Sequence, residues 1–165
     1  MGVMESGQWH DNWYDTGVSQ GRFVRPTSQF RNWVTSDGAP GPNGSGGYKA
    51  EPGRYHLYVS LACPWSHRTI IFRALKGLSG IISVSIVHWL MGADGWTFTE
   101  GPGVVADPIV GARRLYDIYK AAIPTYSGQV TVPLLWDRQT RAIVSNESSD
   151  IIRMMNSAFD TVGAR

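Results

Sequence analysis

The fold of this chain depends most on one stretch of its sequence, Tyr55-His56-Leu57-Tyr58-Val59-Ser60-Leu61-Ala62-Cys63-Pro64-Trp65-Ser66. The first six residues are mostly aromatic or β-branched and predict a β-strand. A turn around Cys63 follows, and residues 66–78 have helical spacing until glycines at 77 and 80 end the pattern. The order strand, turn, helix places Cys63 immediately before a helix with proline in its first turn.

The sequence after this stretch predicts the remaining strands and helices of the fold. Residues 81–88 form a second apolar, β-branched run, which predicts a buried strand and hence a βαβ unit. A long connection then contains one amphipathic helix at about 111–122. Two strands at 132–136 and 142–145, joined by a turn, precede a final helix at 147–156. We therefore expect an α/β, thioredoxin-like fold (βαβαββα) with a mixed four-stranded sheet.

The first fifty residues differ in character and predict an N-terminal extension. They contain the Gly/Pro-rich run 36–47 and, before it, scattered aromatic side chains at Trp9, Trp13, Phe23, Phe30 and Trp33. Such a segment is either an arm that ends in a flexible loop or a segment whose aromatic residues dock on a neighbouring surface. We divide the chain into an arm and loop at 1–53, a thioredoxin-like domain at 54–158 and the start of an interdomain linker at 159–165.

Composition excludes several classes of function. With 165 residues, 42% of them hydrophobic, the chain suffices for one packed domain. The net charge of +2 comes from interspersed charges, so no basic stripe for nucleic acid is present. No segment is long and apolar enough for a membrane span, and the first twelve residues contain no apolar signal region, which predicts a cytoplasmic protein. The histidines are far apart and there is one cysteine, so no metal is expected.

Cys63 is the candidate reactive group. Backbone N–H groups at a helix start stabilise a thiolate, which is the nucleophilic form of cysteine. Ser66 occupies the position where a dithiol motif has its second cysteine, so Cys63 needs an external thiol to resolve a mixed disulfide. The alternative is a lone cysteine that only fills apolar space. His67 could assist proton transfer one turn away, although an exposed histidine without a role is the more common interpretation.

Two further segments indicate a ligand with a peptide backbone. A cis peptide bond at Val132-Pro133 is our hypothesis, because it would turn the Val132 backbone groups outward to pair with such a ligand; an ordinary edge strand is the alternative. Ser145-Asn146-Glu147-Ser148 opens a helix whose first turn could bind a carboxylate, although simple capping explains it equally well. Together with Cys63, these segments favour a peptide thiol such as glutathione.

The motifs in this order resemble those of one family, the glutathionyl-hydroquinone reductases, or xi-class glutathione transferases. The motifs that carry the resemblance are Cys63-Pro64-Trp65-Ser66-His67-Arg68, Gly95-Trp96-Thr97-Phe98, Thr131-Val132-Pro133 and Ile143-Val144-Ser145-Asn146-Glu147-Ser148. The resemblance implies that the Cys63 thiolate attacks the sulfur of a glutathionylated hydroquinone, releases the hydroquinone and becomes a mixed disulfide, which a second glutathione resolves. Glutathione is then the co-substrate, and no metal is needed.

The same resemblance implies the remaining site residues and partners. Trp96 would pack against glutathione, Val132 and Pro133 would present backbone groups to it, and Glu147 and Ser148 would hold its γ-glutamyl end. By family resemblance the protein would also form a homodimer.

Two departures from the family limit what the resemblance implies. Family members are roughly twice as long and have a C-terminal all-helical domain that is missing here, so we expect glutathione affinity but weak or absent reductase activity in this chain alone. Gln129 stands where similar proteins often have an arginine. A non-catalytic glutathione-binding or protein-interaction module is the alternative function. A conventional transferase would favour Ser or Tyr at position 63, so the cysteine favours mixed-disulfide chemistry.

Overall fold

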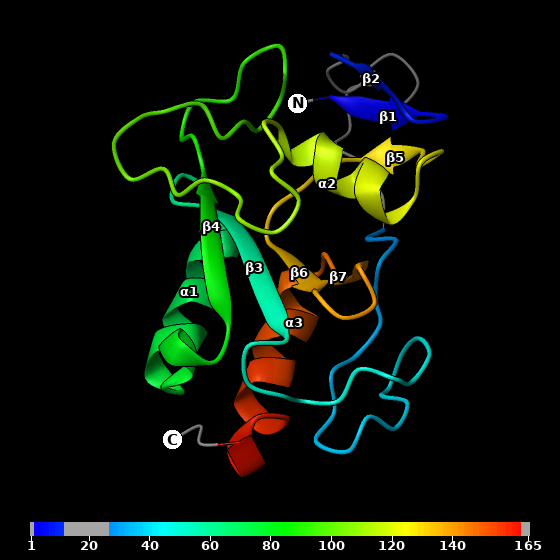
Figure 1. Cartoon of the computed structure of the whole chain (residues 1–165), viewed down its shortest axis with the longest axis vertical. Helices are drawn as coiled ribbons and strands as arrows, with labels where there is room; N and C mark the ends of the chain where they lie inside the picture. Colours follow the sequence, from blue (N-terminus) through cyan, green and yellow to red (C-terminus); the bar gives the residue numbers. More distant parts are fainter. Residues whose placement is uncertain (1, 12–26, 163–165) are drawn as a thin grey trace, which may run out of the picture.

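The computed structural model describes residues 2–11 and 27–162, and its centre is a mixed four-stranded sheet (Figure 1). The strand order is β4-β3-β6-β7. The bounds are β3 (Tyr55–Ser60), β4 (Ser83–Val87), β6 (Leu134–Asp137) and β7 (Ala142–Ser145). β4 runs parallel to β3, whereas β6 is antiparallel to both β3 and β7. This arrangement confirms the predicted sheet.

Helices cover both faces of this sheet. The helices are α1 (Pro64–Leu75), α2 (Leu115–Ala122) and α3 (Ser148–Ser157), with 3-10 turns η1 (Leu78–Gly80) and η2 (Asp160–Val162). Strand β3 alternates, so Tyr55, Leu57 and Val59 join the core cluster that contains apolar residues of α3. Tyr58 joins the opposite cluster, which α2 covers. The period-two pattern of β3 thus separates two cores on either side of one sheet.

The helix boundaries differ from the predicted ones for local reasons. Pro64 is itself the first residue of α1, where a missing N–H costs nothing, and Gly77 adopts a left-handed φ of 67° that ends the helix early. α2 begins at Leu115 rather than near 111. Gly111 has a φ of 72° and Ala112 N–H donates to the buried Asp107, so residues 111–113 stay outside the helix.

A second, smaller sheet was not predicted. Its strands are β1 (Val3–Glu5), β2 (Gln8–His10) and β5 (Gly128–Gln129), in the order β2-β1-β5. The turn between β1 and β2 needs Gly7, whose φ is 80° and whose position would put a Cβ 2.2 Å from the Pro124 carbonyl oxygen. Figure 1 shows this sheet beside α2, at the end of the molecule opposite the C-terminus.

The described part of the N-terminal extension docks on the domain. The Phe30 ring lies 5.8 Å from Tyr119 and 5.6 Å from Tyr126, and the side chains of Trp33 and Val34 enter the core on the α3 side. Docking is therefore the correct alternative for these residues. Trp13 and Phe23 lie outside the described residues. The run 36–47 forms a mostly exposed loop in which Gly47 N–H donates to the Gly38 carbonyl.

Candidate functional site

Cys63 lies at the N-cap of α1, at the end of the sheet where β3 stops. Its backbone is extended, with φ −99° and ψ 118°, and its carbonyl accepts a hydrogen bond from His67 N–H at 3.0 Å. The thiol is partly buried, and Sγ lies 3.7 Å from the Val132 carbonyl oxygen, to which it donates. A thiol in this position is near both the helix dipole and the surface, which is the setting of a reactive cysteine rather than of a core residue.

The segment before β6 faces this thiol. The Val132-Pro133 peptide bond is cis, as predicted. Thr131 is held by Tyr119, whose hydroxyl donates to the Thr131 carbonyl at 2.9 Å and accepts from the Thr131 N–H at 3.2 Å. Within the described part of the chain, no protein acceptor is found for the Val132 N–H. A donor and an acceptor of one residue therefore lie beside Cys63.

The start of α3 forms the other side of the site. Glu147 is the N-cap, and one of its carboxylate oxygens accepts from Ser149 N–H at 3.1 Å. The other oxygen accepts from the Ser28 hydroxyl at 3.0 Å, which brings the N-terminal extension to the site. The Glu147 side chain thus caps α3, as the simpler interpretation of this segment expected. Binding of a ligand carboxylate at the same helix start stays a prediction.

Arg68 connects this helix start to α1. Its Nε donates to the Ser148 hydroxyl at 3.1 Å, and its guanidinium lies 3.8 Å from the Glu147 carboxylate. The guanidinium also lies over the Trp65 ring, 5.0 Å from the centroid. Sequence reasoning included Arg68 only as part of a motif and gave it no role. Its place on the same helix as Cys63, five residues later, is the signal that could have identified it.

The predicted site residues are connected by a nearly continuous path of contacts. Cys63 contacts Val132, and the preceding Thr131 hydroxyl accepts from the Asn146 amide at 3.4 Å. Asn146 immediately precedes Glu147, and Arg68 leads from there back to α1. Trp96 packs with Cys63 against the same apolar cluster, which includes Val132. These contacts bring Cys63, Val132, Pro133 and the start of α3 together, whereas Trp96 is connected to them only through this apolar cluster.

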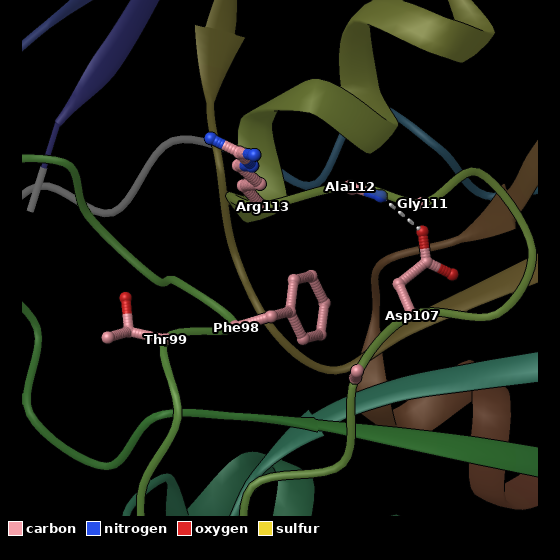
Figure 2. A pocket seen from close by; sticks show the side chains of 7 residues that line it. Phe98, Thr99, Asp107, Gly111, Ala112 and Arg113 are labelled. Carbon is pink, nitrogen blue, oxygen red and sulfur yellow. Dashed lines mark hydrogen bonds between the residues drawn. The ribbon is translucent and has the colours of Figure 1, made fainter.

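Two other features lie apart from this path. The His67 side chain is exposed, and among the described residues its ring makes no hydrogen bond to the Cys63 thiol. A cavity of about 380 Å³ lies between residues 98–99, 106–107 and 111–113 of the long connection, and Figure 2 shows these lining residues. Its Asp107 carboxylate already accepts from Ala112 N–H at 3.0 Å and from the Tyr58 hydroxyl at 2.9 Å. None of the predicted site residues lines this cavity.

The described residues contain neither a membrane-spanning helix nor a cluster of metal ligands. None of their helices has the length and apolar character needed to cross a membrane. Residues 2–11 and 27–162 contain no group of three or more His, Cys, Asp and Glu side chains that could hold a metal ion.

Comparison with known proteins gives a consistent family. Residues 62–158 match the model of the glutathione S-transferase N-terminal domain. The chain is 58% identical over 166 residues to the glutathionyl-hydroquinone reductase YqjG of Escherichia coli (strain K12), covering 100% of the chain and 51% of that relative. It is 54% identical to the glutathionyl-hydroquinone reductase PcpF of Sphingobium chlorophenolicum, covering 99% and 49%.

Solved structures agree with this result. The glutathione-bound structure of Escherichia coli YqjG superposes with a TM-score of 0.85 at 53% identity, covering 98% of this chain and 47% of that one. The xi-class transferase of Natrialba magadii gives a TM-score of 0.83 at 39% identity, covering 100% and 47%. The chain spans about half the length of the curated relatives it matches. The chain belongs to the glutathione S-transferase family, contains its N-terminal domain, and is similar to the xi-class glutathionyl-hydroquinone reductases.

Proposed function

We propose that this chain carries the glutathione site and the reactive thiol of a glutathionyl-hydroquinone reductase. In the first step the Cys63 thiolate forms a bond to the glutathione sulfur, and the bond from that sulfur to the hydroquinone carbon breaks. The electron pair of this bond stays on the carbon, which takes a proton, so the hydroquinone leaves. A second glutathione thiolate then attacks the mixed disulfide, which releases glutathione disulfide and the Cys63 thiolate.

The observation that carries this proposal is the contact between Cys63 and the Val132 segment. A glutathione molecule that adds to the strand edge would pair its backbone with the Val132 N–H and carbonyl. Its cysteine sulfur would then lie next to Sγ, because Sγ is only 3.7 Å from the Val132 oxygen. The helix start beyond it would stabilise the leaving and attacking thiolates in turn.

The γ-glutamyl end of glutathione carries both a carboxylate and an ammonium group, and the start of α3 suits both. The Ser148 hydroxyl, the Arg68 guanidinium and the helix start favour the carboxylate, while the Glu147 carboxylate suits the ammonium. Trp96 would cover the bound peptide from the long connection. Leu61 and Trp65 are exposed beside Cys63 and offer apolar surface to the hydroquinone ring.

Three further expectations belong to this proposal. The physiological substrates are glutathionylated hydroquinones, the protein works in the cytoplasm, and it forms a homodimer. Identity above 50% to two glutathionyl-hydroquinone reductases supports the substrate class. The division into an arm at 1–53, a domain at 54–158 and a linker start at 159–165 is kept as a proposal as well. Sedimentation velocity would test the dimer, because a monomeric species at micromolar concentration would contradict it.

The test is glutathionylation of the purified chain. We expect glutathione disulfide to add one glutathionyl group to the chain, and free glutathione to remove it, both followed by intact mass. Cys63→Ser should show no addition, whereas Ser66→Ala, which removes the hydroxyl of the same motif and leaves the thiol in place, should retain it. An unreactive Cys63 in a chain that still binds S-methylglutathione would refute the enzymatic proposal and favour the non-catalytic module.

A further inference from the structure

The N-terminal hairpin contacts the segment that carries Trp96, although the two are far apart in sequence. Trp9 lies on β2, and its indole Nε1–H donates to the Ala93 carbonyl at 2.8 Å. These residues are 84 positions apart. The bond therefore ties the first hairpin of the chain to the middle of the long connection between β4 and α2.

Packing around the indole is close on both sides. The Trp9 ring stacks on Tyr116 of α2, with centroids 4.9 Å apart and an interplanar angle of 21°. A Cβ at Gly95 would lie 2.8 Å from the Trp9 ring, so the ring touches the Gly95 backbone directly. Gly95 has a φ of 66°, and it closes a turn in which its N–H donates to the Gly92 carbonyl at 2.9 Å. The indole thus holds one defined turn against α2.

This turn ends at Trp96, whose backbone is fixed from the other direction as well. The Trp96 carbonyl accepts from Leu115 N–H at 2.8 Å, at the first residue of α2. Trp9 fixes the residues immediately before Trp96, and α2 fixes Trp96 itself. Only two backbone dihedral angles separate these two restraints, so the position of the Trp96 backbone, from which its side chain projects, depends on the Trp9 indole.

We propose that Trp9 is a positioning residue of the glutathione site, which acts through Trp96 and makes the N-terminal hairpin part of that site. This inference rests on the proposed function, because it assigns Trp96 to glutathione. It adds a residue that does not itself touch the ligand. A packing residue held by a hydrogen bond can keep a binding side chain within the small tolerance that a site requires.

A purely structural role for Trp9 predicts a different result. In that case its replacement lowers the stability of the hairpin, while the fraction of the chain that stays folded binds glutathione as before. A positioning role predicts weaker binding in a folded chain, and it predicts that the effect disappears when Trp96 is absent. Coupling of this kind is measured by a double-mutant cycle.

The experiment measures the Kd of S-methylglutathione by calorimetry for six chains and one control variant. Trp9→Phe retains an aromatic ring for Tyr116 but loses the N–H donor, and Trp9→Ala loses both. Trp96→Ala and its combinations with the two Trp9 variants complete the set beside the unchanged chain. The matched control is Trp89→Phe, because Trp89 lies in the same connection, is half exposed and stacks on His88 instead.

We expect Trp9→Phe to weaken binding by about 3- to 10-fold, as for loss of one neutral hydrogen bond, and Trp9→Ala to weaken it further. Trp89→Phe should bind like the unchanged chain, and in the Trp96→Ala background neither Trp9 change should weaken binding again. Hydrogen exchange of the 92–96 amides should also speed up in both Trp9 variants. Equal weakening with and without Trp96, or no weakening in folded Trp9 variants, would overturn the inference alone. Failure of the unchanged chain to bind would overturn the proposed function and the inference together.

Discussion

Acid should destabilise this domain through one buried histidine, His56. Its ring is fully buried, with Nε2 2.9 Å from the Ser85 hydroxyl and Nδ1 2.6 Å from the Ser83 hydroxyl. Ser85 donates its own proton to the Ala106 carbonyl, so it accepts from Nε2–H, and Nδ1 accepts from Ser83. The neutral ring thus satisfies both nitrogens, and burial lowers the pKa of His56 from 6.5 to about 4.

The sign and size of the effect follow from this pKa. The unfolded chain takes up a proton near pH 6.5, whereas the folded chain resists protonation until about pH 4. Between about pH 6.5 and pH 4 the unfolded state therefore binds more protons at His56 than the folded state does, so the free energy of unfolding falls as the pH falls. The free energy of unfolding should fall by about 2 kcal/mol between pH 7 and pH 5 from this group, and by about 3 kcal/mol at pH 3.

Urea unfolding at several pH values would measure this loss. His56→Gln removes the titrating group, so its unfolding free energy should fall by about 2 kcal/mol less than that of the unchanged chain between pH 7 and 5. His67→Gln is the control, because His67 is exposed on α1 and its variant should follow the unchanged chain. An identical pH dependence in His56→Gln and the unchanged chain would show that the buried ring is not the acid-sensitive group.

Two further predictions concern the buried charges and the site. Asp137→Asn should cost about 2–3 kcal/mol in urea unfolding, because the buried Arg54 guanidinium loses its charged partner at 2.7 Å and keeps only the charge of the less buried Glu51, whereas Lys76→Ala at an exposed pair should cost less than about 1 kcal/mol. Equal costs for the two would contradict this account. Arg68→Lys should weaken S-methylglutathione binding about 10-fold through loss of its bond to Ser148, without changing the rate at which a small non-peptide disulfide reacts with the thiol. A parallel fall in that rate would mean that Arg68 acts on the thiol instead.

The predictable parts of the fold are those that local sequence decides. β3 was predicted with its correct bounds because Tyr55–Ser60 is bounded by turns and rich in strand-forming residues. The small sheet could not be predicted, since its strands have only two or three residues and Val3 pairs with Gln129, which is far away in the sequence. Such short segments cannot show a hydrophobic periodicity, and no local sequence signal identifies the strand with which each of them pairs.

The candidate site divides in the same way. Cys63 before a helix and Pro133 at a strand start are local signals, so sequence alone could assign them. The contact of Arg68 with Ser148 spans 80 positions, and that of Ser28 with Glu147 spans 119. Side chains on separate elements meet only because the sheet order brings α1 and α3 together, which local patterns do not specify.

The pairing of β1 with β5 also constrains when the protein can finish folding during its synthesis. Ser6 N–H donates to the Ser127 hydroxyl, a separation of 121 residues, so the first strand emerges from the ribosome long before its partner exists. At a synthesis rate of about 5–20 residues per second, the hairpin and the indole of Trp9 wait roughly 6–24 s without the surface they pack on. During that interval the apolar residues of the nascent N-terminus are available to chaperones, and the finished glutathione site would be among the last parts of the domain to form.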